Sequence, residues 1–187
     1  MTDTDTVVFQ GWPKIPRLNR NMLISEKIDG TNAGIHVTAD GNVVAQSRNR
    51  LITPNVDNHG FAKWVYINAQ TLAETLGEGL HFGEWWGSGI QRGYGLTKGE
   101  KRFSLFNVYR YQGIHVPEIG LDTVPLLCGA PFTTEHIEHT LAALKEFGSV
   151  AAPGFMDPEG IVIFHEGARH AFKVTIKNDE KPKGLAA

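Results

Sequence analysis

Short runs of alternating apolar and polar residues mark much of this chain, and that alternation is typical of half-buried β-strands. It is clearest in residues 33–38 and in residues 172–177. In the second run, Lys173 and Lys177 occupy polar positions. A two-residue turn signal, Asp40-Gly41, follows the first of these runs and predicts a β-hairpin. Further strands are expected at residues 22–26, 42–46, 80–84, 103–109, 124–127 and 160–164.

Two longer stretches carry the period of an amphipathic helix. The first, residues 58–76, ends before Gly77 and places one apolar stripe on a single face: Phe61, Val65, Ala69, Leu72 and Leu76. The second begins at Thr133 or Thr134 as its N-cap and ends at Gly148, with Ile137, Leu141 and Leu144 on its buried face. Two helices among several hairpins predict an α+β fold with antiparallel β-sheets flanked by helices.

The first hairpin brings an arginine toward the start of its own first strand. If the Asp40-Gly41 turn has two residues, Ala33 pairs with Arg48, and Arg48 returns beside Asn32. A cation there could hold a phosphate by paired hydrogen bonds, or it could lie in water at a strand end. The hairpin alone leaves both interpretations open.

The last hairpin has two possible registers. A two-residue Glu166-Gly167 turn pairs Gly160 with Lys173 and leaves Glu159 on the opposite face. A three-residue loop that includes Ala168 instead places Glu159, Lys173 and Lys177 on one face. A catalytic role for these lysines requires the second register, whereas a surface strand tolerates either.

Composition fits one globular domain spanning residues 1–187. The chain has 41% hydrophobic and 20% charged residues, and a net charge of −2. This charge predicts no overall attraction to nucleic acid, so any such binding needs a local patch, for which residues 14–20, 48–50 and 98–102 are the basic candidates. The eight histidines show no metal-site spacing.

The chain is expected in the cytoplasm. A single cysteine, Cys128, excludes an internal disulfide framework and fits a reducing compartment. The N-terminal residues are acidic and lack the apolar run of a signal peptide, and no segment is long enough to cross a membrane.

The candidate chemistry centres on Lys27, which ends an apolar run just before an Asp29-Gly30 turn. A lysine becomes a nucleophile only when part of it is neutral, which requires burial or nearby cations. Because Asp-Gly turns are common, Lys-x-Asp-Gly alone favours the simpler interpretation, an exposed lysine beside a loop.

The whole set of motifs changes that balance. Glu26-Lys27-Ile28-Asp29-Gly30-Thr31-Asn32 resembles the nucleotidyl-lysine motif of DNA ligases, RNA ligases and capping enzymes, and its Gly-Thr-Asn ending resembles the RNA ligase branch. The remaining motifs follow in the family's order across residues 22–178: Ser47-Arg48-Asn49-Arg50, Phe82-Gly83-Glu84-Trp85-Trp86-Gly87, residues 102–108, Glu159-Gly160-Ile161-Val162-Ile163 and residues 172–177.

This resemblance implies a minimal nucleotidyltransferase domain acting as an ATP-dependent RNA ligase. Lys27 would form a lysyl-AMP intermediate, with Lys173 and Lys177 as further catalytic cations and Glu159 toward a bound Mg²⁺ or Mn²⁺. AMP would then pass to the 5′-phosphate end of a strand. A 3′-hydroxyl end would displace the AMP and so join the two ends, with RNA as the favoured substrate. The other nucleotide-binding positions implied are Glu26 and Ile28 through the backbone, Asn32, Arg48, Glu84, and Phe103 or Phe106.

The chain also departs from the family pattern. Lys173 and Lys177 stand farther apart than the paired lysines of many ligases, and Phe164 stands where many relatives carry lysine. No C-terminal accessory domain is expected after the last motif. A partner protein or a second copy of this chain could therefore supply part of the surface that holds the nucleic-acid ends. A capping-type guanylyltransferase and a non-catalytic nucleotide- or nucleic-acid-binding module are the alternatives, and Asn32 favours the ligase.

Overall fold

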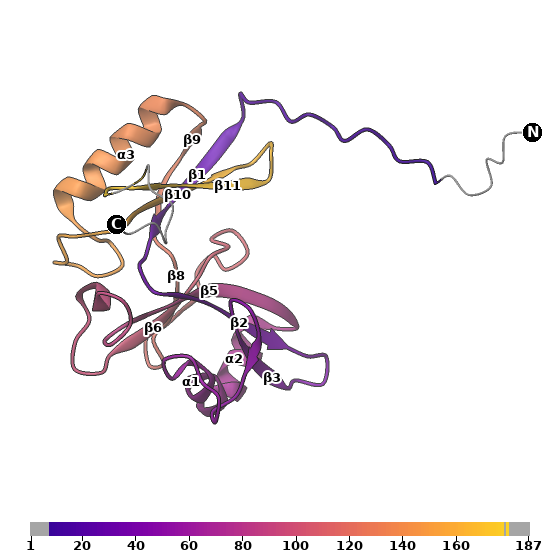
Figure 1. The fold of residues 1–187 in the computed structure, drawn as a ribbon, viewed down its shortest axis with the longest axis vertical. Helices are drawn as coiled ribbons and strands as arrows, with labels where there is room; N and C mark the ends of the chain where they lie inside the picture. Colours follow the sequence, from indigo (N-terminus) through magenta and orange to yellow (C-terminus); the bar gives the residue numbers. More distant parts are fainter. Residues whose placement is uncertain (1–7, 178, 180–187) are drawn as a thin grey trace, which may run out of the picture.

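The computed structural model describes residues 8–177 and 179, which form two β-sheets with helices on their outer faces (Figure 1). The smaller sheet has four antiparallel strands in the order β11-β10-β1-β9. Its strands are β1 (Asn21–Lys27), β9 (Leu126–Pro131), β10 (Gly160–His165) and β11 (His170–Thr175).

The larger sheet has seven strands in the order β4-β3-β2-β5-β6-β8-β7. In chain order they are β2 (Thr31–Val37), β3 (Val43–Ser47), β4 (Leu51–Ile52), β5 (Gly79–Gly87), β6 (Lys101–Leu105), β7 (His115–Val116) and β8 (Leu121–Thr123). All neighbours are antiparallel except β6 and β8, which run parallel. The expected α+β fold of antiparallel sheets and flanking helices is confirmed, with this one parallel pair as an addition.

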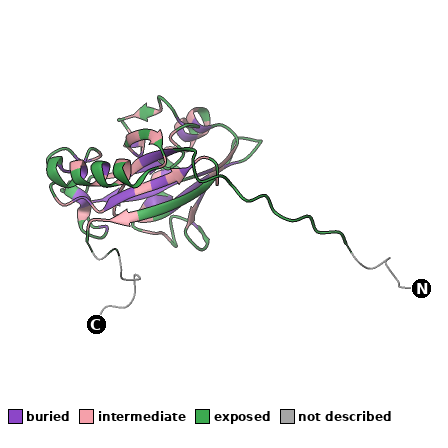
Figure 2. Ribbon diagram, turned by 90° about the horizontal axis from the view of Figure 1, so that it is seen from above, coloured by how far each residue is buried: buried purple, intermediate pink, exposed green. Residues whose placement is uncertain are grey.

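Helix α3 (Thr134–Phe147) covers the smaller sheet. Its Leu144 packs with Met22, Ile24, Ile161 and Ile163 in one buried cluster. The helix begins as expected, because the Thr133 side chain accepts a hydrogen bond from the His136 N–H, and it ends at Gly148. In Figure 2 this helix lies along one side of the sheet, exposed on its outer face.

The single helix expected over residues 58–76 is wrong, because the structure has two. Helix α1 (Phe61–Ile67) and helix α2 (Ala69–Leu76) meet at Asn68. The Asn68 backbone leaves the helical conformation, with φ −105° and ψ 17°, and both its N–H and its side-chain amide donate to the Trp64 carbonyl, at 3.1 and 2.8 Å. Both helices still pack on the larger sheet as the apolar stripe predicts, with Phe61, Val65 and Leu72 buried.

Two strand predictions also need correction. The strand expected at residues 103–109 ends at Leu105. The strand expected at residues 124–127 is instead a crossing, where the chain leaves β8 in the larger sheet and enters β9 in the smaller one. None of the helices within the described part of the chain is long and apolar enough to cross a membrane.

The predicted register of the first hairpin is wrong by one residue. Ala33 pairs with Ser47, not with Arg48, because the connection between β2 and β3 has one residue more than the Asp40-Gly41 turn implies. Thr38 and Asn42 close it, with the Thr38 N–H donating to the Asn42 carbonyl at 2.9 Å.

Both registers considered for the last hairpin are wrong. Val162 pairs with Lys173 and Gly160 with Thr175, across a four-residue connection. This register places Phe172 and Val174 opposite Ile163 and Ile161, so that all four apolar side chains share the face toward α3. Lys173 consequently lies on the other face of the sheet.

Residues 28–30 link β1 to β2, so the chain passes there from the smaller sheet to the larger one. A small third cluster packs at this passage, with Ile28, Trp86, Tyr94 and Val124 among its buried members. Gly30 is required at this point by close packing, because a Cβ atom would lie 2.5 Å from the Trp85 carbonyl oxygen. The lysine motif therefore occupies the junction of the two sheets.

Candidate active site

Lys27 is the last residue of β1 and points to a carboxylate from the neighbouring strand end. Its Nζ donates to Glu159 Oε2 at 2.6 Å, and the side chains of Lys27 and Glu159 are only 18% and 11% exposed. β1 and β10 place the two residues together, since Lys27 pairs with Gly160. The amine is thus held in one position at the junction of the sheets rather than free in water.

Glu26, the residue before Lys27, is 1% exposed and fully hydrogen-bonded within the protein. One carboxylate oxygen accepts from the hydroxyls of Tyr94 and Ser149, and the other accepts from the N–H groups of Val150 and Ala151. The sequence suggested that the backbone near Glu26 reads a nucleotide base. The structure shows a different role for its side chain, which fastens the segment after α3 to the strand that carries Lys27.

Tyr94 joins this buried carboxylate to both partners of the ion pair. Its hydroxyl donates to Glu26 at 2.8 Å, lies 3.3 Å from the Lys27 carbonyl oxygen and accepts from the Glu159 N–H at 3.3 Å. Tyr94 lies in the short 3₁₀ segment η1 (Gly93–Gly95) with a φ of 41°, a backbone conformation that is rare outside glycine. Burial and the Glu26 carboxylate both raise the pKa of the hydroxyl, so it stays protonated.

Glu84 stands in the larger sheet opposite this junction. Its carboxylate accepts from the Gly30 N–H at 3.1 Å and lies 3.4 Å from the amide nitrogen of Asn32, its pairing partner on β2. Burial raises the pKa of Glu84 to about 7, although the nearby Lys27 lowers it. A buried carboxyl group whose pKa is raised in this way by desolvation, beside a lysine, is a candidate functional group.

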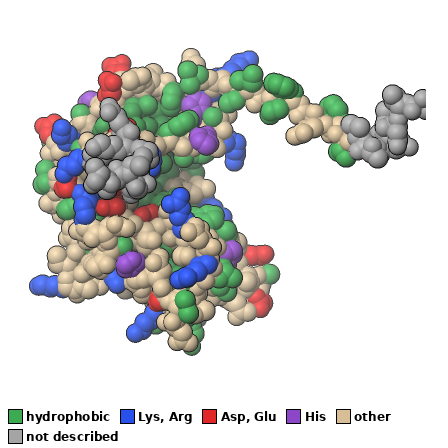
Figure 3. All heavy atoms as spheres, in the orientation of Figure 1, with side chains coloured by type: hydrophobic (Ala, Val, Ile, Leu, Met, Phe, Trp, Pro, Cys, Tyr) green, Lys and Arg blue, Asp and Glu red, His purple; other side chains and the backbone are tan. Residues whose placement is uncertain are grey.

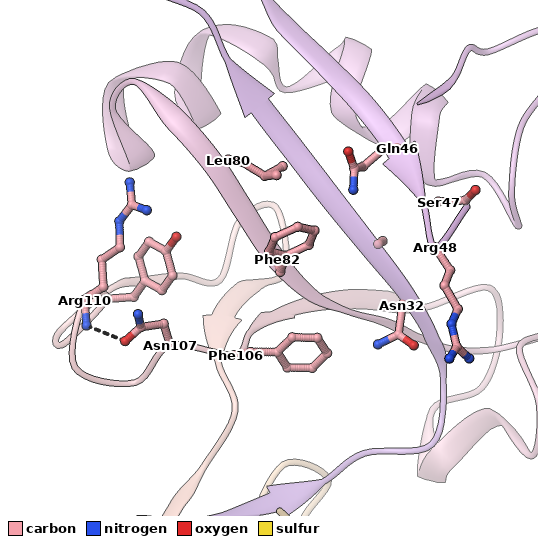
Figure 4. Close-up of a pocket in the computed structure, with 11 residues that line it drawn as sticks. Asn32, Gln46, Ser47, Arg48, Leu80, Phe82, Phe106, Asn107 and Arg110 are labelled. Atoms are coloured by element: carbon pink, nitrogen blue, oxygen red, sulfur yellow. Dashed lines mark hydrogen bonds between the residues drawn. The ribbon is translucent and has the colours of Figure 1, made fainter. Parts of the chain in front are cut away.

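A cavity of about 480 Å³ opens beside Asn32, the partner of Glu84, on the face of these strands that is turned away from α1 and α2 (Figure 4). This volume lies in the range of small-molecule sites. Its lining combines apolar, aromatic and polar side chains: Asn32, Ala33, Gln46, Ser47, Arg48, Leu80, Phe82, Phe106, Asn107, Arg110 and Tyr111. In Figure 4 the side chains of Asn32 and Arg48 lie close together at one end of the pocket. Arg48 therefore reaches this site despite the shifted register of its hairpin.

Strand alternation decides which aromatic residue can face a nucleotide. Leu80, Phe82 and Glu84 alternate along β5 and share the pocket face, whereas Trp85 lies on the opposite face and is 2% exposed. Phe103 pairs with Trp85 and is fully buried, packed against Phe61 at a ring-centroid distance of 5.1 Å. Phe103 is therefore a core residue and does not reach the pocket.

Phe106 is the remaining candidate for stacking on a base. It follows directly after β6, is 42% exposed and lines the cavity together with Phe82. In Figure 4 both rings lie over the same part of the pocket.

The two C-terminal lysines take different positions. Lys173 lies in one row with Ser25 and Val162 across the smaller sheet, on the face that also carries Lys27. Lys177 follows β11, and its Nζ donates to Asp157 Oδ1 at 2.6 Å. This ammonium holds the pKa of Asp157 below its usual range.

An arginine that the sequence analysis did not single out connects the lysine motif to this region. Arg92 donates to Asp29 at 3.0 Å and to Asp157 at 2.5 Å. Lys177 shares Asp157, so these charges form one chain from the Asp29-Gly30 loop to the last motif. Arg92 and Tyr94 were missed because a Gly-rich loop carries no periodicity; the tyrosine between two glycines was the available signal.

The protein offers few ligands for a divalent metal at this site. Among the described residues, no three His, Cys, Asp or Glu side chains gather as a metal site. Mg²⁺ commonly uses one or two carboxylates together with phosphate oxygens and water, and Glu159 can supply one such carboxylate. The donor set therefore suits a metal carried by a nucleotide rather than a metal held by the protein alone.

Comparisons with known proteins agree with this geometry. The profile of the RNA ligase family matches residues 20–177. Among solved structures, a Naegleria gruberi RNA ligase variant with AMP and Mn superposes with a TM-score of 0.58 at 18% identity, covering 84% of this chain and 50% of that one. Another variant of that enzyme with ATP and Mn gives a TM-score of 0.56 at 18% identity, covering 84% and 49%.

Two further results set the scope of this match. No curated protein matches the sequence. The chain spans about half the length of the solved structures, and these share its fold at low identity. The family match itself covers most of the chain, from the start of the smaller sheet to the last motif. This protein therefore belongs to the RNA ligase family.

Proposed function

We propose that this protein is an ATP-dependent RNA ligase that works through a lysyl-AMP intermediate on Lys27. The observation that carries the proposal is the position of Lys27 at the junction of the two sheets. Its amine is fixed against Glu159, and Glu84 and Asn32 stand across the junction beside a pocket of nucleotide size. The family match and the AMP- and ATP-containing structures of similar fold support it.

The first step is attack of the Lys27 Nζ on the α-phosphorus of ATP. A nitrogen–phosphorus bond forms, the bond to the bridging oxygen breaks, and pyrophosphate leaves. The amine must be neutral to attack, and Glu159 Oε2, at 2.6 Å, is the base within reach of its proton. Because buried contacts fix both residues, little reorganisation is needed before attack.

The pocket face of the larger sheet would hold the nucleoside. Phe106 can stack on the adenine, with Phe82 beside it. Glu84 would accept hydrogen bonds from ribose hydroxyls, and Arg48 and Asn32 at the pocket end suit phosphate oxygens. The backbone of Glu26 and Ile28 would lie along the adenine edge.

AMP then passes to the 5′-phosphate of a polynucleotide, forming a phosphoanhydride and releasing Lys27. A 3′-hydroxyl attacks that 5′-phosphate, the phosphodiester forms, and AMP leaves. Lys173 and Lys177 would neutralise charge that grows on the phosphates. A Mg²⁺ or Mn²⁺ ion held partly by Glu159 would supply the same electrostatic help at the reacting phosphate.

The alternatives make different predictions about the nucleotide. A capping-type guanylyltransferase would take GTP, and a non-catalytic module would take neither nucleotide covalently. Asn32 beside Glu84 favours the ligase branch over the capping enzymes, and the fixed Lys27–Glu159 pair favours catalysis over mere binding.

The test is intact-protein mass spectrometry after incubation with ATP or GTP and magnesium. One AMP per chain with ATP, and no GMP with GTP, is the expected result. The purified adduct is then mixed with a nicked RNA duplex that carries a 5′-phosphate, and loss of AMP should accompany sealing. An adduct with GTP alone, or no adduct with either nucleotide, would overturn the proposal.

A further inference from the structure

An extended arm, residues 8–20, precedes the first strand and leaves the body of the protein (Figures 1 and 2). Large apolar side chains on this arm are exposed to an unusual degree, with Phe9 at 91%, Trp12 at 89% and Ile15 at 85%. Figure 3 shows these apolar groups along the arm, outside the compact part of the molecule. The arm also lies before the region matched by the RNA ligase profile, which starts at residue 20.

The arm has a period of three residues. Apolar side chains recur at Phe9, Trp12, Ile15 and Leu18; prolines recur at Pro13 and Pro16; and cations recur at Lys14, Arg17 and Arg20. A polyproline II helix has three residues per turn, so each series falls on its own edge of such a helix. Each proline also holds the residue before it in an extended conformation. The backbone is therefore partly ordered before anything binds to it.

Its base is fixed to the smaller sheet. The His165 Nε2–H donates to the Leu18 carbonyl at 2.7 Å, and the Phe132 N–H donates to the Arg20 carbonyl at 2.8 Å. The base lies at the opposite end of β1 from Lys27, a strand of seven residues, or roughly 20 Å. Residues 8–17, before the fixed base, can span about 30 Å when extended, so they can reach the neighbourhood of the junction.

Charge identifies the kind of partner. The arm carries three cations, and no acidic residue lies between Asp5 and Glu26. Because the whole chain has a net charge of −2, the remainder of the chain carries −5. Two exposed aromatic rings, Phe9 and Trp12, stand directly before these cations. Aromatic rings and cations on one segment form the combination that binds single-stranded nucleic acid, by stacking on bases and contacting phosphates.

Other uses of the arm fit less well. Pro13 and Pro16 lack the N–H groups that a strand needs to pair along a sheet edge, so the arm is a poor added strand. The Pro13-Lys14-Ile15-Pro16 sequence matches the PxxP pattern read by aromatic-lined protein grooves. That match does not account for the aromatic edge formed by Phe9 and Trp12.

We propose that residues 8–20 form a nucleic-acid-binding arm that grips the polynucleotide substrate remote from Lys27. Phe9 and Trp12 stack on unpaired bases, and Lys14, Arg17 and Arg20 contact the phosphates. The inference rests on the proposed ligase function for the identity of the strand. Among the three basic candidates in the sequence, residues 14–20, 48–50 and 98–102, it assigns the grip on the strand to the first, which alone lies beside exposed aromatic rings on the arm.

The test measures binding of a fluorescein-labelled, 5′-phosphorylated single-stranded RNA to the full chain by anisotropy. Trp12→Ala should weaken binding about 5- to 100-fold, and its matched control is Tyr66→Ala, which removes another exposed aromatic ring, on α1. Lys14→Ala with Arg17→Ala should lower the slope of log affinity against log salt by roughly 1.4. The matched control is Lys63→Ala with Lys145→Ala, which removes two exposed lysines elsewhere.

RNA affinity and salt slope that stay at the unchanged values in the arm variants would overturn the proposal. An equal loss in the control variants would overturn it too, because binding would then be diffuse. Capture of a PxxP-reading domain together with unchanged RNA binding would assign the arm to a protein partner instead. Formation of the AMP adduct is measured separately by mass spectrometry. If the unchanged protein forms no adduct, the ligase proposal fails. The RNA-binding measurement then still decides whether the arm binds nucleic acid.

Discussion

The two sheets hold their functional side chains by different means. In the smaller sheet, Lys27 is the last residue of a strand. Its backbone is held by a buried hydrogen-bond network in which the Tyr94 hydroxyl contacts both Glu26 and the Lys27 carbonyl oxygen. In the larger sheet, Phe82 and Glu84 stand within a strand, and simple alternation places both on the face that carries the pocket, which Phe82 lines. A reacting group must be placed within a fraction of an ångström, which needs several bonds, whereas a binding surface needs only the correct face. Changes in the network should therefore affect rate and stability together, and changes on the pocket face should affect nucleotide binding.

The largest effect is expected at the ion pair. Glu159→Gln keeps the shape but removes the base beside Lys27, so the rate of AMP adduct formation should fall by about 10²- to 10⁴-fold. Rapid-quench sampling with intact-mass detection measures that rate. Glu138→Gln, on the exposed side of α3, is the matched control. An unchanged rate in Glu159→Gln would mean that the pair only holds the structure.

Two phenylalanines three residues apart should separate folding from binding. Phe103→Ala leaves a cavity in the core and should lower the free energy of unfolding by about 3–5 kcal/mol. Phe106→Ala should leave the melting temperature nearly unchanged and weaken ATP binding by about 1–3 kcal/mol through lost stacking. Chemical denaturation and calorimetric titration with ATP measure the two quantities. If Phe103→Ala weakened ATP binding without loss of stability, the assignment of the two faces would be reversed.

Glu84 should make stability depend on pH. Its pKa is about 7 in the folded protein and 4.5 as the ordinary value, because burial disfavours the charged form. Between these pH values the folded protein keeps a proton that the unfolded chain has released. Stability should therefore fall as pH rises through this window, by up to roughly 3 kcal/mol.

Glu84→Gln stays neutral at every pH and should remove this dependence. Its melting temperature should exceed that of the unchanged protein above pH 7 and match it more closely near pH 5, while ATP binding weakens at both. Thermal melts across the pH range decide the matter, with Glu146→Gln on the exposed surface as control. Parallel pH profiles for both proteins would show that Glu84 does not titrate there.

The smallest effect is expected from a single hydroxyl. Tyr94→Phe removes the donor to Glu26 and should cost about 1.5–3 kcal/mol of stability, because the lost bond involves a charged group. It should also slow adduct formation, since the same hydroxyl contacts the Glu159 N–H. Tyr109→Phe removes an exposed hydroxyl bonded to Glu166 and serves as control. Lost stability with an unchanged rate would limit the network to folding.

Local patterns predicted the elements better than the way they meet. Alternation and capping identified β1, β2 and α3, because these signals lie within a few residues of one another. Both hairpin registers were wrong, since one added residue in a loop shifts every pair, and the sequence does not fix loop length.

The same limit applies to the candidate site. The motif set identified Lys27, Glu84 and Glu159, and the structure brings these three residues to one junction. The choice between Phe103 and Phe106 required the pairing of β5 with β6, which joins residues about twenty positions apart. Arg92 and Tyr94 act through partners more than sixty residues away. The tyrosine between two glycines marks an unusual loop position, but the local sequence does not identify those partners.

We propose that the smaller sheet supplies the nucleophile and that this nucleophile is Lys27. Peptide mapping by mass spectrometry after incubation with ATP and magnesium locates the AMP. Lys27 lies in a different proteolytic peptide from Lys173 and Lys177, and fragmentation separates the last two. One AMP is expected, attached to the peptide that contains Lys27, and no adduct is expected in Lys27→Ala. An AMP on Lys173 or Lys177, or full labelling of Lys27→Ala, would contradict it.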